Sequence, residues 1–142
     1  MRITDILRRK GDDVVTIAPG ESVQALLDAL ARHRVGALVV SSGDGALDGI
    51  VSERDVVRRL QTDGAAVLSS RVSDIMTAAV HTATPEDTLD DLMVLMTDRR
   101  VRHIPVVVDG RLHGIVSIGD VVKHRIEELQ VERDQLTAYI TG

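Results

Sequence analysis

The nine residues Gly49–Val57 read GIVSERDVV, and they return almost unchanged as Gly114–Val122, GIVSIGDVV. The two stretches begin 65 residues apart and differ only at their fifth and sixth positions. A repetition of this length within 142 residues indicates an internal duplication of the chain. We call these nine residues the repeated motif, and whatever surrounds one copy of it is expected to surround the other.

The similarity extends upstream of the repeated motif. Thr16–Pro19, TIAP, matches Thr82–Pro85, TATP, at a separation of 66 residues. Further upstream, Ile3–Leu7, ITDIL, resembles Val72–Met76, VSDIM. Almost the whole chain up to about residue 126 is therefore covered twice. We predict one domain over residues 1–66, a second over 67–126, and a C-terminal helical extension over 127–142.

Each copy contains the same succession of patterns. A short strand, at Val14–Ile17 or Val80–Thr82, leads through a proline into an amphipathic helix. A continuous apolar strand follows, at Val35–Val40 or Ile104–Val108, and a glycine turn brings the chain back as a second strand. That second strand ends in the repeated motif, from which another helix begins.

The predicted fold class is therefore α/β, with two tandem β-α-β-β-α repeats. The N-caps of the first helices are predicted at Ser22 and Thr88. A strand–helix–strand crossover favours parallel pairing and the hairpin adds an antiparallel strand, so each copy builds a small mixed sheet. A unit of about 60 residues is marginal alone, so the copies are expected to pack together about a pseudo-twofold axis. Residues 61–71 are predicted to be the linker between them.

Composition excludes several classes of protein. Hydrophobic residues make up 44% of the chain, yet no apolar run approaches the roughly 18 residues that span a membrane. The N-terminus shows no apolar signal segment, and the absence of cysteine excludes disulfides and thiolate chemistry. We therefore expect a cytoplasmic protein. The net charge of −5 and a single aromatic residue, Tyr139, disfavour nucleic-acid binding, for which only the basic cluster at 99–103 speaks.

The polar positions of the repeated motif allow two interpretations. Ser52 with Asp55, and Ser117 with Asp120, fit a capping box, in which hydroxyl and carboxylate satisfy the first backbone amides of a helix. The same arrangement places helix amides and a carboxylate at the end of a strand, where they can bind a polar ligand. An ionised carboxylate only accepts hydrogen bonds, so it suits the paired hydroxyls of a ribose.

The duplicated unit, with its Gly-apolar-apolar-Ser-x-x-Asp ending, resembles the CBS domain, which is named after cystathionine β-synthase. Two in tandem resemble a Bateman module, here of the stand-alone bacterial type. The resemblance covers residues 2–126, and Val101–Val108, VRHIPVVV, followed by Gly110 and Gly114–Asp120, is its most characteristic part.

The resemblance implies non-catalytic sensing of an adenosyl ligand (AMP, ADP, ATP, NAD or S-adenosylmethionine) in clefts between the paired domains. The ribose-binding residues that it implies are Ser52, Asp55, Ser117 and Asp120. The residues expected to line the base are Thr16, Ile17, Ala18, Val35, Gly36, Ala37, Thr82 and Ala83. Arg54 lies in the motif of the first copy, and Arg102 and His103 lie on the middle strand of the second. If the two copies pack face to face, we expect these three residues to converge on phosphates, with which arginine forms charge-assisted hydrogen bonds.

Other chemistry finds less support in the sequence. The five histidines include no HExxH pattern or helical pair, so we predict no metal site, and no nucleophile–base set indicates an enzyme. Val94 and Leu95 widen the apolar face of the helix in the second copy, which favours a homodimer. We expect an unidentified regulated protein as the partner of this dimer. The alternative is a scaffold dimer whose clefts bind no ligand.

Overall fold

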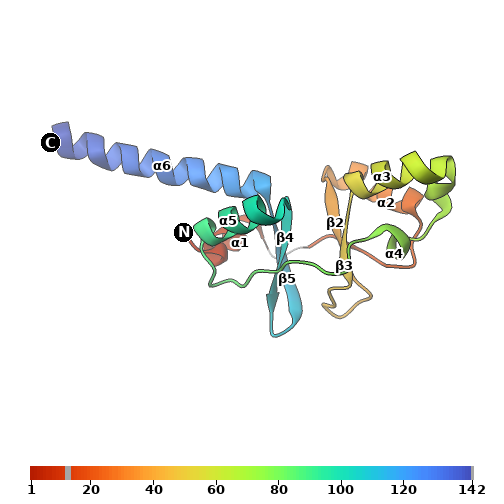
Figure 1. Cartoon of the computed structure of the whole chain (residues 1–142). Helices are drawn as coiled ribbons and strands as arrows, with labels where there is room; N and C mark the ends of the chain where they lie inside the picture. Colours follow the sequence, from red (N-terminus) through yellow and green to blue (C-terminus); the bar gives the residue numbers. More distant parts are fainter. Residues whose placement is uncertain (12–13, 142) are drawn as a thin grey trace.

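The computed structural model describes residues 1–11 and 14–141 (Figure 1). In the first copy, β1 (Thr16–Ile17) leads into α2 (Val23–His33), which is followed by β2 (Ala37–Val40), β3 (Gly49–Ser52) and α3 (Glu53–Asp63). The sheet order is β1-β2-β3, with β1 parallel to β2 and β3 antiparallel to it. The predicted β-α-β-β-α order and mixed sheet are confirmed in this copy.

The second copy contains α5 (Leu89–Arg99), β4 (His103–Val108), β5 (Arg111–Ser117) and α6 (Ile118–Thr141). β4 and β5 form an antiparallel pair. The strand predicted at 80–82 is reduced to a single parallel bridge between Ala83 and Val106. The fold class is confirmed, and the predicted C-terminal extension is the distal part of one continuous helix.

Capping residues explain where the first helix of each copy begins. The amide of Ala25 donates to Ser22 Oγ at 3.1 Å. In the second copy the Thr88 amide donates to Asp91 Oδ2 at 3.0 Å, and the Asp91 amide donates to Thr88 Oγ1 at 3.1 Å. Hydrogen bonding from the Thr88 amide, and then from its hydroxyl, lowers the pKa of the exposed Asp91 carboxyl. Both predicted N-caps are confirmed.

The helices that precede the two copies pack on the opposite copy. α1 (Ile3–Lys10) contributes Ile3 and Ile6, both fully buried, to the core that α5, β4 and β5 build. α4 (Val72–Ile75) belongs in the same way to the core of the first copy. We call α1 and α4 the lead-in helices. The division of the sequence between residues 66 and 67 therefore does not divide the hydrophobic cores.

The segment predicted to be a linker is helical instead. α3 continues to Asp63, and a 3₁₀ helix, η1 (Gly64–Ser69), follows directly. Val67 of η1 is fully buried in the first core. The segment QTDGAAVLSSR carries enough apolar side chains to pack, and that packing overrides its polar ends.

The glycine that opens the repeated motif allows a close approach in both copies. A Cβ atom on Gly49 would lie 2.6 Å from the carbonyl oxygen of Thr77, which pairs with β3 through Ile50. A Cβ on Gly114 would lie 2.7 Å from a methyl group of Leu7 in α1. Gly49 of the first copy therefore leaves room for the segment that leads into the second copy. Gly114 of the second copy leaves room for α1, which precedes the first copy in the sequence.

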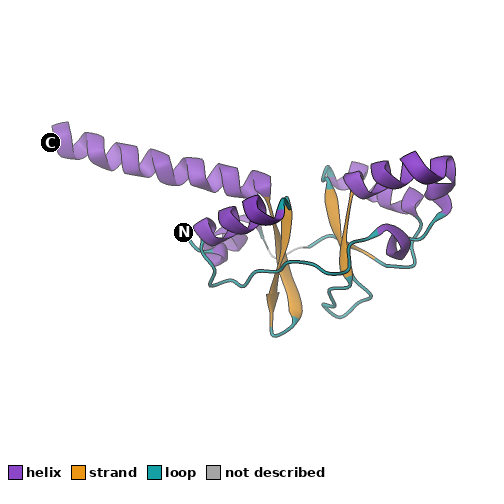
Figure 2. Ribbon diagram, viewed as in Figure 1, coloured by secondary structure: helices purple, strands orange, loops and turns teal. Residues whose placement is uncertain are grey.

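Figure 1 shows the overall arrangement. The strands of both copies lie toward the middle of the molecule, and the helices lie on the outer sides (Figure 2). The distal part of α6 projects away from the rest of the chain (Figure 1). Both copies of the repeated motif thus end near the middle, where β3 passes into α3 and β5 passes into α6.

Candidate functional site

A cleft of 410 Å³ lies where the two copies meet, and we call it the first cleft. The first copy lines it with the end of β3 and the start of α3, and the second copy with the segment after α4 and the start of β4. Its residues are Gly36, Ala37, Ile50, Ser52, Glu53, Arg54, Asp55, Arg58, Thr77, Ala79, Val80, His81, Arg100, Val101, Arg102 and His103.

Asp55 combines the two interpretations of the repeated motif. Its Oδ2 accepts hydrogen bonds from the Ser52 amide at 2.8 Å and from Ser52 Oγ at 3.1 Å. Its Oδ1 takes part in no hydrogen bond within the described part of the chain. One carboxylate oxygen therefore organises the start of α3, while the other remains available to a hydroxyl group in the cleft.

Four arginines line the first cleft. Arg54 and Arg58 lie one turn apart on α3, and Arg100 and Arg102 flank the start of β4. Within residues 1–11 and 14–141, none of the four forms an ion pair with a carboxylate. Among the described residues that line the cleft, Glu53 and Asp55 alone carry negative charge. The cleft therefore offers an excess of guanidinium groups, which bind phosphate oxygens through paired donors.

His103 stands beside this cationic group in a partly buried position. Burial lowers the pKa of His103 below its ordinary value of 6.5, and the ammonium of Lys10 lowers it further. The imidazole is therefore neutral at pH 7, when it can still donate one hydrogen bond. A phosphate placed next to it would favour the protonated form.

Small and apolar residues line another part of the cleft. Gly36 and Ala37 come from the start of β2, and Val80 and Val101 come from the second copy. The Glu53 amide donates to the Gly36 carbonyl oxygen at 3.0 Å, which fixes the start of α3 beside β2. A wall with little side-chain bulk next to a carboxylate suits a planar base attached to a sugar.

Several residues predicted to line a base lie outside the first cleft. Ile17 and Ala83 are buried in the first and second cores. Thr16 lines a shallow hollow beside Ser41 and His113, and Val35 lines an apolar groove between α2 and α3. Ala18 and Thr82 are exposed, and neither belongs to the first cleft.

The second copy of the motif is built in the same way but has an additional partner. Asp120 Oδ2 accepts from the Ser117 amide at 2.9 Å and from Ser117 Oγ at 3.1 Å. The ammonium of Lys10 also contacts this oxygen, at 2.6 Å. Partial burial raises the pKa of Asp120, but the hydrogen bonds from Lys10 and Ser117 outweigh it and leave the pKa below its ordinary value.

Sequence reasoning missed two arginines and a histidine of the cleft. Arg58 follows Arg54 by four residues, so helical spacing was a signal that both share one face. Arg100 caps the C-terminus of α5 in a left-handed conformation with a φ of 53°, and its place in the cleft depends on how the two copies pack. His81 carries no pattern of its own, and only the packing of the two copies brings it to the cleft.

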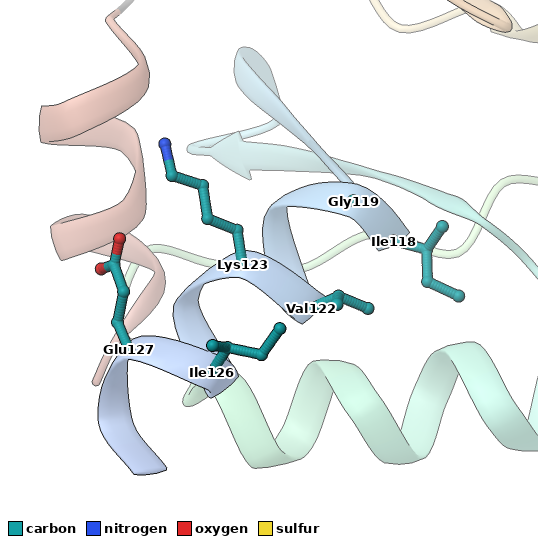
Figure 3. Close-up of a pocket in the computed structure, with 6 residues that line it drawn as sticks. All are labelled: Ile118, Gly119, Val122, Lys123, Ile126 and Glu127. Atoms are coloured by element: carbon teal, nitrogen blue, oxygen red, sulfur yellow. The ribbon is translucent and has the colours of Figure 1, made fainter. Parts of the chain in front are cut away.

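An apolar groove lies at the start of α6. Ile118, Val122 and Ile126 border it and are each about half exposed (Figure 3). Elsewhere in the described residues, no group of His, Asp or Glu side chains is close enough to hold a metal ion. None of the described helices is long and apolar enough to cross a membrane.

Comparison with known proteins assigns the chain to a family. The model of the CBS domain matches residues 3–62 and again residues 72–127. The CBS domain-containing protein CBSX3, mitochondrial, of Arabidopsis thaliana is 39% identical, over 99% of this chain and 72% of that protein. The crystal structure of the CBS-domain containing protein ATU1752 from Agrobacterium tumefaciens is 46% identical, with a TM-score of 0.85 over 88% of this chain and 99% of that one.

A third similar structure contains adenosyl ligands. It is the CBS domain pair of protein MJ0100 in complex with methylthioadenosine and S-adenosyl-L-methionine, which is 25% identical with a TM-score of 0.76. The alignment covers 87% of this chain and 98% of that chain. With two matches to the family model and close structural relatives along most of its length, the chain belongs to the CBS domain family as a tandem pair of such domains.

Proposed function

We propose that the protein is a non-catalytic regulatory module that binds an adenine nucleotide in the first cleft. The observation that carries this proposal is the convergence on one cleft between the two copies of Asp55 and four arginines that form no ion pair within the described residues. The carboxylate matches the hydroxyls of a ribose, the apolar wall matches a base, and the guanidinium groups match phosphates. AMP, ADP, ATP and NAD share these three parts.

The charge of the cleft favours a ligand with phosphates over S-adenosylmethionine. The sulfonium and ammonium groups of that molecule are cationic, and four guanidinium groups would repel them. Each added phosphate brings more negative charge to the same group of arginines. Among adenosyl ligands we therefore expect affinity to rise from AMP to ATP, with S-adenosylmethionine binding more weakly than either.

Isothermal titration calorimetry with AMP, ADP, ATP, NAD and S-adenosylmethionine tests the proposal, with GTP as the control for the base. Binding of a phosphate-bearing adenosyl ligand at micromolar concentration, with GTP markedly weaker, is the expected result. If none of these ligands binds, Asp55 acts only as a helix cap. The alternative function, a scaffold dimer whose clefts bind no ligand, would then be the better supported of the two.

Binding of ATP is expected to strengthen as the pH falls from about 8 to about 6. The pKa of His103 is lowered in the free protein, and a bound phosphate raises it, so the complex takes up a proton. Calorimetry in buffers of different ionisation enthalpy measures that proton directly. His103→Gln should remove most of it, although His81 also lies in the cleft. Undiminished proton uptake by His103→Gln would contradict this assignment.

We further propose that two chains associate through the half-exposed apolar face of α3 and α6. Val57 and Val122 occupy the same position of the repeated motif, and Ile118 and Ile126 extend the face on α6. Val122→Glu is expected to convert the dimer into a monomer, as measured by sedimentation equilibrium. Val131→Glu is the matched control, because Val131 is 55% exposed against 51% for Val122 but lies on another side of α6. Equal behaviour of the two variants would contradict this interface.

The output of such a module is a change in the relative packing of its two copies. A nucleotide in the first cleft contacts both copies, so it favours the arrangement that it fits best. We propose that a separate regulated protein in the cytoplasm reads this arrangement.

A further inference from the structure

The two copies of the repeated motif differ in what contacts their aspartates. Asp55 Oδ2 accepts only from Ser52 among the described residues, whereas Asp120 Oδ2 accepts from Ser117 and also from Lys10. The Lys10 ammonium donates a further hydrogen bond to the Ile115 carbonyl oxygen at 2.9 Å. The side chains of Lys10 and Asp120 are 35% and 23% exposed, so this ion pair is partly exposed at the start of α6.

Lys10 reaches Asp120 because the packing of α1 positions it there. It is the last residue of α1, whose Ile3 and Ile6 are fully buried in the second core. The preceding residue, Arg9, pairs with Glu127 of α6. The segment that follows the other lead-in helix, residues 77–80, lines the first cleft and carries no cationic side chain.

A lysine in this position competes with a sugar. Asp120 binds a ribose only by accepting from its hydroxyls, and the ammonium already donates to the carboxylate with a charge-assisted hydrogen bond. A neutral hydroxyl forms a weaker bond with a carboxylate than an ammonium does, and a carboxylate already neutralised by an ammonium attracts the hydroxyl less. The Asp120 carboxylate therefore has a tethered cation beside it, which Asp55 lacks among the described residues.

We propose that Lys10 selects the site: its ammonium pairs with Asp120 Oδ2 at 2.6 Å and neutralises that carboxylate, so that each chain binds one nucleotide, in the first cleft. The region around Asp120 accepts a nucleoside only when the Lys10 side chain moves away from the carboxylate. This inference rests on the proposed function for the identity of the ligand. The contact between Lys10 and Asp120 does not depend on it.

Lys10→Met tests the inference by the number of ligands bound per chain. Titration with ATP, and separately with adenosine, is expected to give one site in the wild-type chain and two in Lys10→Met. The added site should disappear in the double variant Lys10→Met/Asp120→Ala. Lys123→Met is the matched control, because Lys123 is the only other lysine of the chain and, within the described structure, pairs with neither Asp55 nor Asp120. A partly exposed ion pair contributes little net stability, so Lys10→Met is expected to remain folded.

Two sites in the wild-type chain would overturn the proposal. So would the absence of an added site in Lys10→Met when both ATP and adenosine have been titrated. Failure of the first cleft is distinguishable from failure of this inference. If the wild-type chain binds nothing, the proposed function is wrong, yet a site gained in Lys10→Met would still support the role of Lys10.

A measurement without ligand uses the two lysines directly. In protein labelled with ¹³C at the lysine ε-carbon, Asp120→Asn is expected to shift the Lys10 signal and leave that of Lys123 in place. An unmoved Lys10 signal would show that the contact is not made and would likewise overturn the proposal.

Discussion

Asp55→Ala is expected to weaken the binding of ATP by roughly 100-fold, since it removes the hydrogen bonds that the carboxylate accepts from the ribose. A 100-fold change corresponds to about 2.7 kcal/mol. One hydrogen bond to a charged group contributes about 1.5–3 kcal/mol, so the net loss of one such bond accounts for the factor. Calorimetric titration of the variant against the wild-type chain measures the change. The arginines remain in the variant, so residual binding should depend strongly on salt.

Loss of the helix cap must be separated from loss of the ligand contact. Asp91 caps α5 with the same geometry that Asp55 uses on α3, and it lies outside the first cleft. Asp91→Ala is therefore expected to lower stability while leaving the affinity for ATP within about twofold. If Asp91→Ala weakens binding as much as Asp55→Ala does, the effect comes from helix ends and Asp55 does not hold the ribose.

Ile6→Ala is expected to lower the free energy of unfolding by about 2–5 kcal/mol. Ile6 precedes the first copy in the sequence, but it is fully buried in the core of the second. Its truncation leaves a cavity between α1 and the helices of that core. Urea denaturation measures the loss, and a loss below about 1 kcal/mol would contradict the packing of α1 described here.

Double-mutant cycles locate Ile6 in one core or the other. Leu92 belongs to the same core cluster as Ile6, and Leu26 belongs to the cluster of the first copy. Ile6→Ala combined with Leu92→Ala is expected to deviate from additivity by about 0.5–3 kcal/mol. The combination with Leu26→Ala should add within about 0.5 kcal/mol. The reverse pattern would place α1 on the first copy.

Local patterns in the sequence predicted much of the fold. The duplicated motif and the caps at Ser22 and Thr88 concern residues a few positions apart, so their structure follows from spacing. The first cleft was predicted in part, since Asp55, Arg54, Arg102 and His103 line it together.

Contacts between distant residues were beyond such patterns. Arg100 and His81 join the cleft only because the two copies pack as they do. Lys10 and Asp120 are 110 residues apart, and no local rule relates them. The exchange of lead-in helices is hidden in the same way, since ITDIL and VSDIM fit either core equally well as sequences.

The exchange of α1 and α4 also bears on how this chain arose. A single ancestral copy, half as long, would have carried a lead-in helix that covers the core of another copy and not its own. Such a polypeptide would have been complete only after trading helices with a second molecule, as domain-swapped dimers do. A duplicated gene that joins two such copies, as this chain does, places the exchange within one polypeptide. The first core is complete only after residues 72–75 have been synthesised. The second core includes Ile3 and Ile6, which are synthesised before the rest of that core. We therefore expect the two copies to fold cooperatively. In solenoid proteins, by contrast, each repeat contacts only its neighbours.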